Sequence, residues 1–268
     1  MVSTIQCRAN PVLSRASSPS AYPAGMSKLD FTALTGALTS PDVRDSVSQG
    51  FAAPNGGGNT VRIFNSTVST LGVAGEYYNA DGFSPTPDNK GMLVQVALKK
   101  ANVSSGDKCA AMVFIMLEGD STTDVGYILG LTDSVTPRLC LRKGSLAGGL
   151  PSAAIVGEQG VLALSTATFP LDTWVHVQFQ AIVNVGSDTV IQVKTNDLGA
   201  HSVLSPVWTY PAGLKDLTKA FDVTFVDDAA GVASGTPGLT SGLGGVAMWT
   251  NAPNRRVFFD AFEIVAQP

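Results

Sequence analysis

Two histidines, His176 and His201, are the first candidates for proton transfer in this sequence, because imidazole titrates near neutral pH. His176 stands between Trp174 and Gln178 on the polar side of an alternating segment. No acidic residue stands two positions away on that side to orient the ring. We therefore predict that His176 is a surface or semi-buried structural residue, and catalysis by it remains the less favoured hypothesis.

Motifs of other chemistries are missing. The sequence has no G-x-S-x-G, no H-E-x-x-H and no G-x-x-x-x-G-K, and its glycine runs at 56–58 and 242–245 contain no lysine. The three cysteines, Cys7, Cys109 and Cys140, form neither a disulfide framework nor a metal-ligand pattern. We expect Cys109 and Cys140 to be small buried residues, and the chain to be made in a reducing compartment.

The composition is poor in charge. Charged residues make up 14% of the 268 residues, against about 25% in an average soluble domain. The net charge is −4 and no basic cluster exists, so we predict no nucleic-acid partner. No apolar run approaches the roughly 20 residues of a membrane span. Such a surface would suit a subunit whose faces are covered by neighbouring molecules.

The clearest structural pattern is a β-hairpin over residues 174–195. Odd positions from Val175 to Val183 are apolar, whereas Trp174, His176, Gln178 and Gln180 alternate with them. Successive side chains of a strand point to opposite faces, so this alternation predicts a half-buried strand. A five-residue turn around Gly186 then leads to a second, antiparallel strand.

Strand patterns continue through most of the chain and predict an all-β fold. The expected strands are Thr60–Thr67, Met92–Lys99, Ala110–Leu117, Gly126–Leu131, Arg138–Lys143, Gly160–Ser165, Trp174–Asn184, Thr189–Thr195, Phe221–Val226, Gly244–Thr250 and Arg256–Val265. Residues 110–117 and 257–265 are apolar on both faces and should be central strands. Many short strands separated by turns favour a two-sheet antiparallel sandwich, or jelly roll.

The part of the chain before residue 60 is predicted to lie outside the sandwich. Residues 1–28 form a predicted extended arm rich in Ser, Pro and Ala, without a secretory apolar core. The arm either packs on its own domain or is clamped by neighbouring subunits, and its composition favours the second. Residues 29–59 are predicted to hold two short helices, one over Leu29–Leu38 and one starting at Ser40, before a Gly-rich link. The sandwich is expected to span 60–268.

Three segments carry a resemblance to a known family. They are residues 174–177 (WVHV), the end of the hairpin at 194–196 (KTN), and residues 256–264 (RVFFDAFEI). Together they resemble the concanavalin-A-like lectin and glucanase sandwiches, which include laminin-G-like modules. The resemblance covers about residues 60–268 and implies the fold more than a function.

The glucanase branch of that family implies a strand with alternating acids. Glu118 and Asp120 have the spacing of the first two, but Thr122 and Thr123 stand where the last should be. Asp260 and Glu263 are three residues apart and would face opposite sides of a regular strand. Glycoside hydrolysis is therefore an alternative that we do not favour, and we expect no enzyme activity.

The lectin branches imply two kinds of binding residue. Loop acids could hold a structural calcium ion, although ordinary turn positions are the simpler interpretation. The candidate acids are Asp120, Asp124, Asp227 and Asp228. Exposed loop aromatics could stack on sugar rings, and ordinary packing is again the alternative. The candidate aromatics are Tyr77, Tyr78, Trp208 and Tyr210.

The function hypothesis follows from these expectations together. The phage setting is what the resemblance implies, because similar concanavalin-like sandwiches are common in the virions of tailed phages as decoration, neck, baseplate or fibre-associated subunits. We predict a non-catalytic virion structural protein, made in the host cytoplasm without a signal peptide. Its partners would be copies of itself and other virion proteins through the arm, with host-surface glycan as a further ligand. A free carbohydrate-binding module or lectin is the main alternative.

Overall fold

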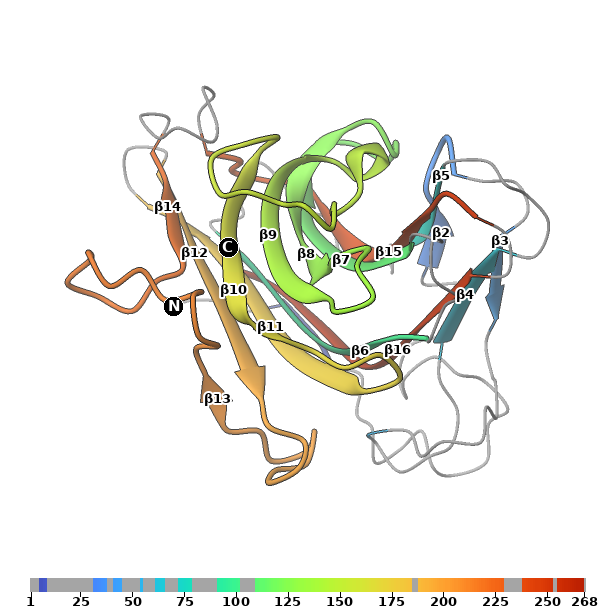
Figure 1. Ribbon diagram of the computed structural model, residues 1–268. Coiled ribbons are helices and arrows are strands. Elements are labelled where there is room, and N and C mark those ends of the chain that lie inside the picture. The colour runs from blue at the N-terminus through green and yellow to red at the C-terminus, as the bar shows by residue number, and fades with distance from the viewer. Residues whose placement is uncertain are drawn as a thin grey trace.

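The computed structural model describes residues 5–8, 31–37, 41–44, 54, 61–65, 72–78, 91–101, 109–184, 188–228, 238–252 and 255–267. Within these ranges every pair of neighbouring strands is antiparallel. The strands form two layers, which lie one above the other in Figure 1. The predicted all-β, two-sheet sandwich is therefore confirmed.

The larger layer is a nine-stranded sheet with the order β13-β12-β11-β6-β16-β4-β3, to which β1 and β14 are added beside β16 and β12. Its strands are β1 (Ile5–Arg8), β3 (Pro41–Arg44), β4 (Val61–Asn65), β6 (Gly91–Lys100), β11 (Trp174–Val183), β12 (Thr189–Asn196), β13 (Trp208–Thr209), β14 (Phe225–Asp227) and β16 (Arg255–Gln267). We call this layer the large sheet.

The second layer is a seven-stranded sheet with the order β10-β9-β8-β7-β15-β5-β2. Its strands are β2 (Phe31–Ala33), β5 (Gly72–Tyr78), β7 (Cys109–Leu117), β8 (Val125–Leu131), β9 (Arg138–Ser145), β10 (Val161–Thr168) and β15 (Leu243–Thr250). A 3₁₀ turn, η3 (Leu146–Gly148), follows β9. We call this layer the small sheet.

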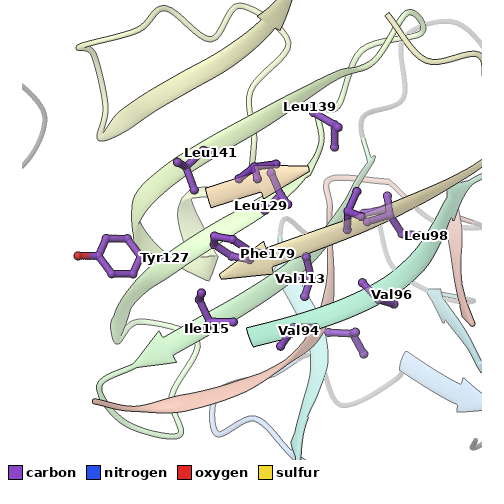
Figure 2. Close-up of a cluster of buried hydrophobic side chains, with 14 of the residues drawn as sticks. Val94, Val96, Leu98, Val113, Ile115, Tyr127, Leu129, Leu139, Leu141 and Phe179 are labelled. Atoms are coloured by element: carbon purple, nitrogen blue, oxygen red, sulfur yellow. The ribbon is translucent and has the colours of Figure 1, made fainter. Parts of the chain in front are cut away.

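The core fills the space between the two sheets, because each contributes one apolar face to it. Figure 2 shows apolar side chains of β6 and β11 meeting those of β7, β8 and β9. The labelled members are Val94, Val96, Leu98, Val113, Ile115, Tyr127, Leu129, Leu139, Leu141 and Phe179. All ten have a relative exposure of 0%, so the alternation predicted for the hairpin does direct Phe179 and its neighbours inward.

A second apolar cluster lies on the other face of the small sheet. It contains Met112, Phe114, Ile128 and Cys140 from the strands, and Leu150 from the segment after η3. β7 is therefore buried on both faces along its whole length, as the sequence predicted. Cys109 and Cys140 are buried free thiols, which confirms their expected packing role.

Arg142 holds residues 146–160, the segment that covers this second apolar cluster, in place. Its guanidinium donates to the carbonyl oxygens of Gln159 at 2.7 Å, Ser145 at 3.1 Å and Gly149 at 3.0 Å. A guanidinium offers several donors in a fixed plane, so one side chain can satisfy carbonyls from both ends of the segment. Residues 146–160 are in this way fixed over the apolar face of the small sheet.

The two predicted helices were wrong. Phe31–Ala33 forms strand β2 against Tyr78–Glu76 of β5, and Pro41–Arg44 forms strand β3 against β4. The second half of the predicted helical segment, beyond Arg44, lies outside the described residues up to Pro54. Both strands lie at the edge of a sheet. Hydrogen bonds to the neighbouring strand therefore outweigh the helical preference that the apolar spacing suggested.

Other predicted boundaries need smaller corrections. Strand β5 was not predicted at all, and the strand expected at Phe221–Val226 is limited to Phe225–Asp227. Asp260 and Glu263 do not face opposite sides, because β16 carries a bulge between them and Ala261 has a φ of +50°. The bulge adds one residue to β16 between the two acids, so Asp260 lies opposite Ala97 and Glu263 opposite Gln95. Ala97 and Gln95 share one face of β6, and the two acids therefore share that face as well.

The described part of the arm is strand β1. Ile5–Arg8 pairs with residues 263–266 of β16 in the same chain. This strand therefore packs on its own domain, which is the alternative that the sequence had left open. No helix among the described residues is long and apolar enough to cross a membrane.

Candidate functional site

The outer face of the large sheet is polar along its central strands. On β11 this face carries Trp174, His176, Gln178 and Gln180, and the register places them opposite Lys99, Ala97, Gln95 and Leu93 of β6. On the other side of β11, the facing residues of β12 are Asn196, Lys194 and Gln192. Gln178 and its glutamine neighbours are half-buried, so this face offers amide donors and acceptors near the surface.

One end of this face is organised by Asn196. Its Nδ2 donates to the carbonyl oxygen of Ser202 at 3.2 Å and lies 3.2 Å from Nδ1 of His176, and its Oδ1 accepts from the backbone N–H of Val207 at 3.0 Å. The ring of Trp208 packs on His176 with centroids 4.6 Å apart. Asn196 and His176 therefore fix the segment that leaves β12.

His176 is buried, so its predicted surface or semi-buried position was wrong. It is 1% exposed, and burial lowers its pKa from 6.5 to about 4. The imidazole is neutral at physiological pH, and Nδ1 is the acceptor for the Asn196 amide. A neutral imidazole packed between the amide of Asn196 and the indole of Trp208 supports the segment that leaves β12 rather than transferring protons.

Residues 197–224 form an excursion between β12 and β14 that returns to the sheet at several points. Gln192 Nε2 donates to the carbonyl oxygen of Asp222 at 2.7 Å. The ring of Tyr210 lies beneath two ammonium groups, with its centroid 5.2 Å from Lys194 Nζ and 5.7 Å from Lys215 Nζ. These contacts hold the excursion beside the polar face, where it projects from the body of the sandwich (Figure 1).

Two adjoining hollows lie where the excursion leaves the hairpin. The larger has a volume of about 650 Å³ and is bounded by Asp172–Trp174, by Leu198–Ser202 and by Pro54. The smaller has a volume of about 320 Å³ and reaches from Phe169 to Thr209. Thr173, Trp174, Leu198 and Gly199 line both.

Trp174 is the central side chain of this site. It is the first residue of β11, it is half-buried, and Lys99 Nζ lies 6.0 Å from the centroid of its ring. The turn before it is tied to β6, because the N–H of Asp172 donates to the carbonyl oxygen of Lys100 at 2.9 Å. Asp172 adopts a φ of +59°, a left-handed conformation that Asp tolerates better than most residues.

The facing wall is a tight turn. Oδ1 of Asp197 accepts from the N–H of Gly199 at 2.9 Å, and the Asp197 carbonyl accepts from the N–H groups of Ala200 and His201 at 3.1 and 2.8 Å. Asp residues commonly close such turns with their own side chain. The turn places His201 and Ser202, both exposed, across the larger hollow from Trp174.

The four aromatic residues predicted to bind glycan have different surroundings. Trp208 is half-buried against His176, and Tyr210 lies beside Lys194 and Lys215. Tyr77 and Tyr78 belong to β5 and are 9% and 3% exposed in the two apolar clusters. Their expected loop position was wrong, and neither ring offers an open face.

The four predicted calcium ligands do not come together. Asp120 is exposed, and Oδ2 of Asp124 accepts from the N–H of Ser121 at 2.8 Å in the turn after β7. Asp227 is buried and forms a 2.7 Å ion pair with Lys143, while Tyr127 O–H donates to the same oxygen at 2.7 Å. Asp228 follows it at the surface.

No group of three or more His, Cys, Asp or Glu residues that could hold a metal ion occurs in the described ranges. Glu118 and Asp120, the acid pair considered for hydrolysis, are exposed and line neither hollow.

Sequence reasoning placed Trp174 on the correct face but missed its importance. The sequence feature that could have marked Trp174 as a candidate binding residue was its position at the start of the polar face, directly after Asp172 and Thr173. The partner wall at Leu198–Ser202 follows the hairpin, so only the fold of the excursion brings it back to Trp174.

The strand pairing and the hollows define an antiparallel two-sheet sandwich with a polar, partly open sheet face. No family model and no curated protein matches the sequence. Among solved structures it is similar to the carbohydrate-binding module CBM66 from Bacillus subtilis, with 9% identity and a TM-score of 0.43 over 87% of this chain and 93% of that one.

Two further structures have a comparable similarity. The potassium-bound carbohydrate recognition domain of Emp46p has 8% identity and a TM-score of 0.46 over 88% of each chain. The alginate lyase Aly36B has 11% identity and a TM-score of 0.46 over 98% of this chain and 96% of that one. At these values the similarities carry no argument about the ligand of this protein.

Proposed function

We propose that the protein binds glycan in the hollows beside Trp174. The observation that carries this proposal is a half-buried indole, fixed at the start of a central strand, that lines two adjoining hollows at once. An indole offers a flat apolar surface for the C–H groups of a sugar ring, and it costs little conformational entropy to hold in place.

The polar groups around the indole suit the same ligand. Asp172, His201 and Ser202, whose side chains are a carboxylate, an imidazole and a hydroxyl, line the larger hollow. Sugars present hydroxyl groups that both donate and accept, so a mixed lining of this kind can pair with them.

The test is glycan binding by the wild type and by Trp174→Ala. We expect at least one saturable ligand on a glycan array, and calorimetry should show its affinity falling by about tenfold or more when the indole is removed. Phe221→Ala is the matched control, since Phe221 is 54% exposed and lines neither hollow. No binding by the wild type, or equal binding by Trp174→Ala, would contradict the proposal.

The biological setting that we propose is a tailed-phage virion, in which the protein is a non-catalytic structural subunit made in the host cytoplasm. Its low charge supports contact with other proteins, and so do exposed apolar side chains on the excursion. These are Leu204, Val207, Leu217 and Phe221.

Light scattering tests the structural setting. A defined oligomer of the full chain would support a structural subunit, whereas a stable monomer would favour a free carbohydrate-binding module instead. Polysaccharide cleavage that is lost in Glu118→Gln would contradict the non-catalytic assignment.

A further inference from the structure

The two hollows beside Trp174 are adjacent parts of one surface depression. They share Thr173, Trp174, Leu198 and Gly199, and each also has residues of its own. Gly199 is exposed, and a Cβ placed on it would meet only Oδ1 of Asp197, at 3.2 Å. Gly199 therefore lines both hollows without a side chain that could separate them.

The size of the depression exceeds the needs of a single sugar ring. Pockets for drug-sized ligands measure roughly 300–1,000 Å³. The smaller hollow, at about 320 Å³, reaches the lower end of this range, and the larger, at about 650 Å³, lies well within it. A monosaccharide is smaller than a drug-sized molecule, so it would leave much of the depression empty.

Each hollow has its own polar and apolar groups. Asp172, His201 and Ser202 line the larger hollow only, whereas Thr195, Thr209 and Phe169 line the smaller one only. Both can therefore offer a sugar unit hydrogen bonds together with apolar contact.

The charge of the lining favours a neutral ligand. Asp172 lines the larger hollow and Asp197 the smaller, and no Lys or Arg lines either hollow among the described residues. Lys99 lies near the Trp174 ring, but it is only 2% exposed and interacts with Asp172. A uronate ligand would bring its carboxylate towards Asp197, and no Lys or Arg among the described lining residues would pair with it.

We propose that the two hollows are neighbouring subsites for one uncharged oligosaccharide, whose chain passes over Gly199 with Trp174 between the subsites. This inference rests on the proposed glycan binding and adds the length and the charge of the ligand.

The experiment uses the full chain and two blocking variants. Ala200 lines only the larger hollow and Thr209 only the smaller, and both residues are exposed. Ala200→Phe and Thr209→Phe should each fill one hollow without disturbing the core. Thermal melting of both variants should match the wild type.

The ligands are neutral oligosaccharides of one to four residues from the best array hit, with uronate oligomers of the same lengths. We expect the neutral tetrasaccharide to bind the wild type about tenfold or more tightly than its monosaccharide, and each variant to lose about tenfold of that affinity. The monosaccharide should respond to one variant at most.

The outcomes separate this inference from the function on which it rests. Binding that does not depend on chain length, sensitivity of the tetrasaccharide to only one variant, or tighter binding of uronate would overturn the two-subsite inference while glycan binding stands. Absence of any ligand for the wild type would overturn both.

Discussion

The outer faces of the two sheets have opposite characters. The large sheet presents Gln95, Gln178 and Gln180 in a half-buried polar array, whereas the small sheet presents Met112 and Phe114 at 0% exposure beneath a fixed segment. Each sheet also carries an excursion of the chain. Residues 197–224 lie beside the polar face, held by polar contacts and by the buried Leu214, and contribute to the hollows. Residues 146–160 cover the apolar cluster of the small sheet.

This difference shows how one fold separates stability from binding. An apolar sheet face must be covered, because exposure would cost hydrophobic free energy along its whole area. A polar face can stay partly open, since water satisfies its amides when no ligand does. The covered face therefore contributes mainly to folding, and the open face is where a ligand can bind.

The largest expected contrast comes from matched leucines in the two excursions. Leu150 is 0% exposed over the small sheet, and Leu217 is 84% exposed in the other excursion. Leu150→Ala should lower the free energy of unfolding by about 2–5 kcal/mol, because it leaves a cavity. Leu217→Ala should change it by less than about 0.5 kcal/mol. Urea denaturation measures both, and similar losses would remove the distinction between the excursions.

The polar excursion should respond to pH through His176. Its pKa is about 4 in the folded chain, against 6.5 for an unperturbed imidazole, so the unfolded state binds more protons between these limits. Stability should therefore fall as the pH drops from 6.5 to 4, by up to roughly 3 kcal/mol from this group. His176→Gln should lack this part of the loss. Urea denaturation of both proteins at about pH 7, 5 and 4 tests this prediction. An equal dependence of the unfolding free energy on pH in the two proteins would contradict the role given to His176.

Two glycines extend the comparison to the backbone. Gly149 has a φ of +60°, and a Cβ there would lie 2.6 Å from the ring of Trp249. Gly149→Ala should cost about 1–3 kcal/mol through backbone strain and this close approach. Gly199→Ala should cost less than about 0.5 kcal/mol, since Gly199 is exposed and only the carboxylate of Asp197 lies near. Thermal unfolding of the two variants gives the ranking.

The smallest effect is expected on the open face itself. Gln178 is half-buried opposite Gln95 and Lys194, where water can replace its amide. Gln178→Ala should change the free energy of unfolding by less than about 0.5 kcal/mol. A loss comparable with that of Leu150→Ala would show that this face contributes to stability as the covered one does.

Local patterns were sufficient for much of the fold. Trp174–Val183 and Thr189–Asn196 were predicted to within one residue at each end, because alternation with a period of two is a property of consecutive residues. The continuous apolar run of β7 likewise showed that both of its faces are covered. The preference for a structural His176 came from what the same strand lacked, an acid beside it.

Other features depend on contacts between distant residues. The apolar spacing of Phe31 and Leu34 fitted a helix, but β2 forms because the edge of β5 offers ladder hydrogen bonds there. Asp260 and Glu263 share a face only because pairing with β6 accommodates a bulge. Neither outcome is encoded in the spacing of neighbouring residues.

The candidate site divides in the same way. The sequence by itself determined that Trp174 begins the polar face of a half-buried strand, since side-chain direction follows from residue parity. Only the tertiary structure decided that Leu198–Ser202 lines the hollow with Trp174. This arrangement depends on Asn196, which contacts His176 of β11 and binds the carbonyl oxygen of Ser202 in the excursion. A hollow is a relation between segments that the chain brings together, and local periodicity carries no information about it.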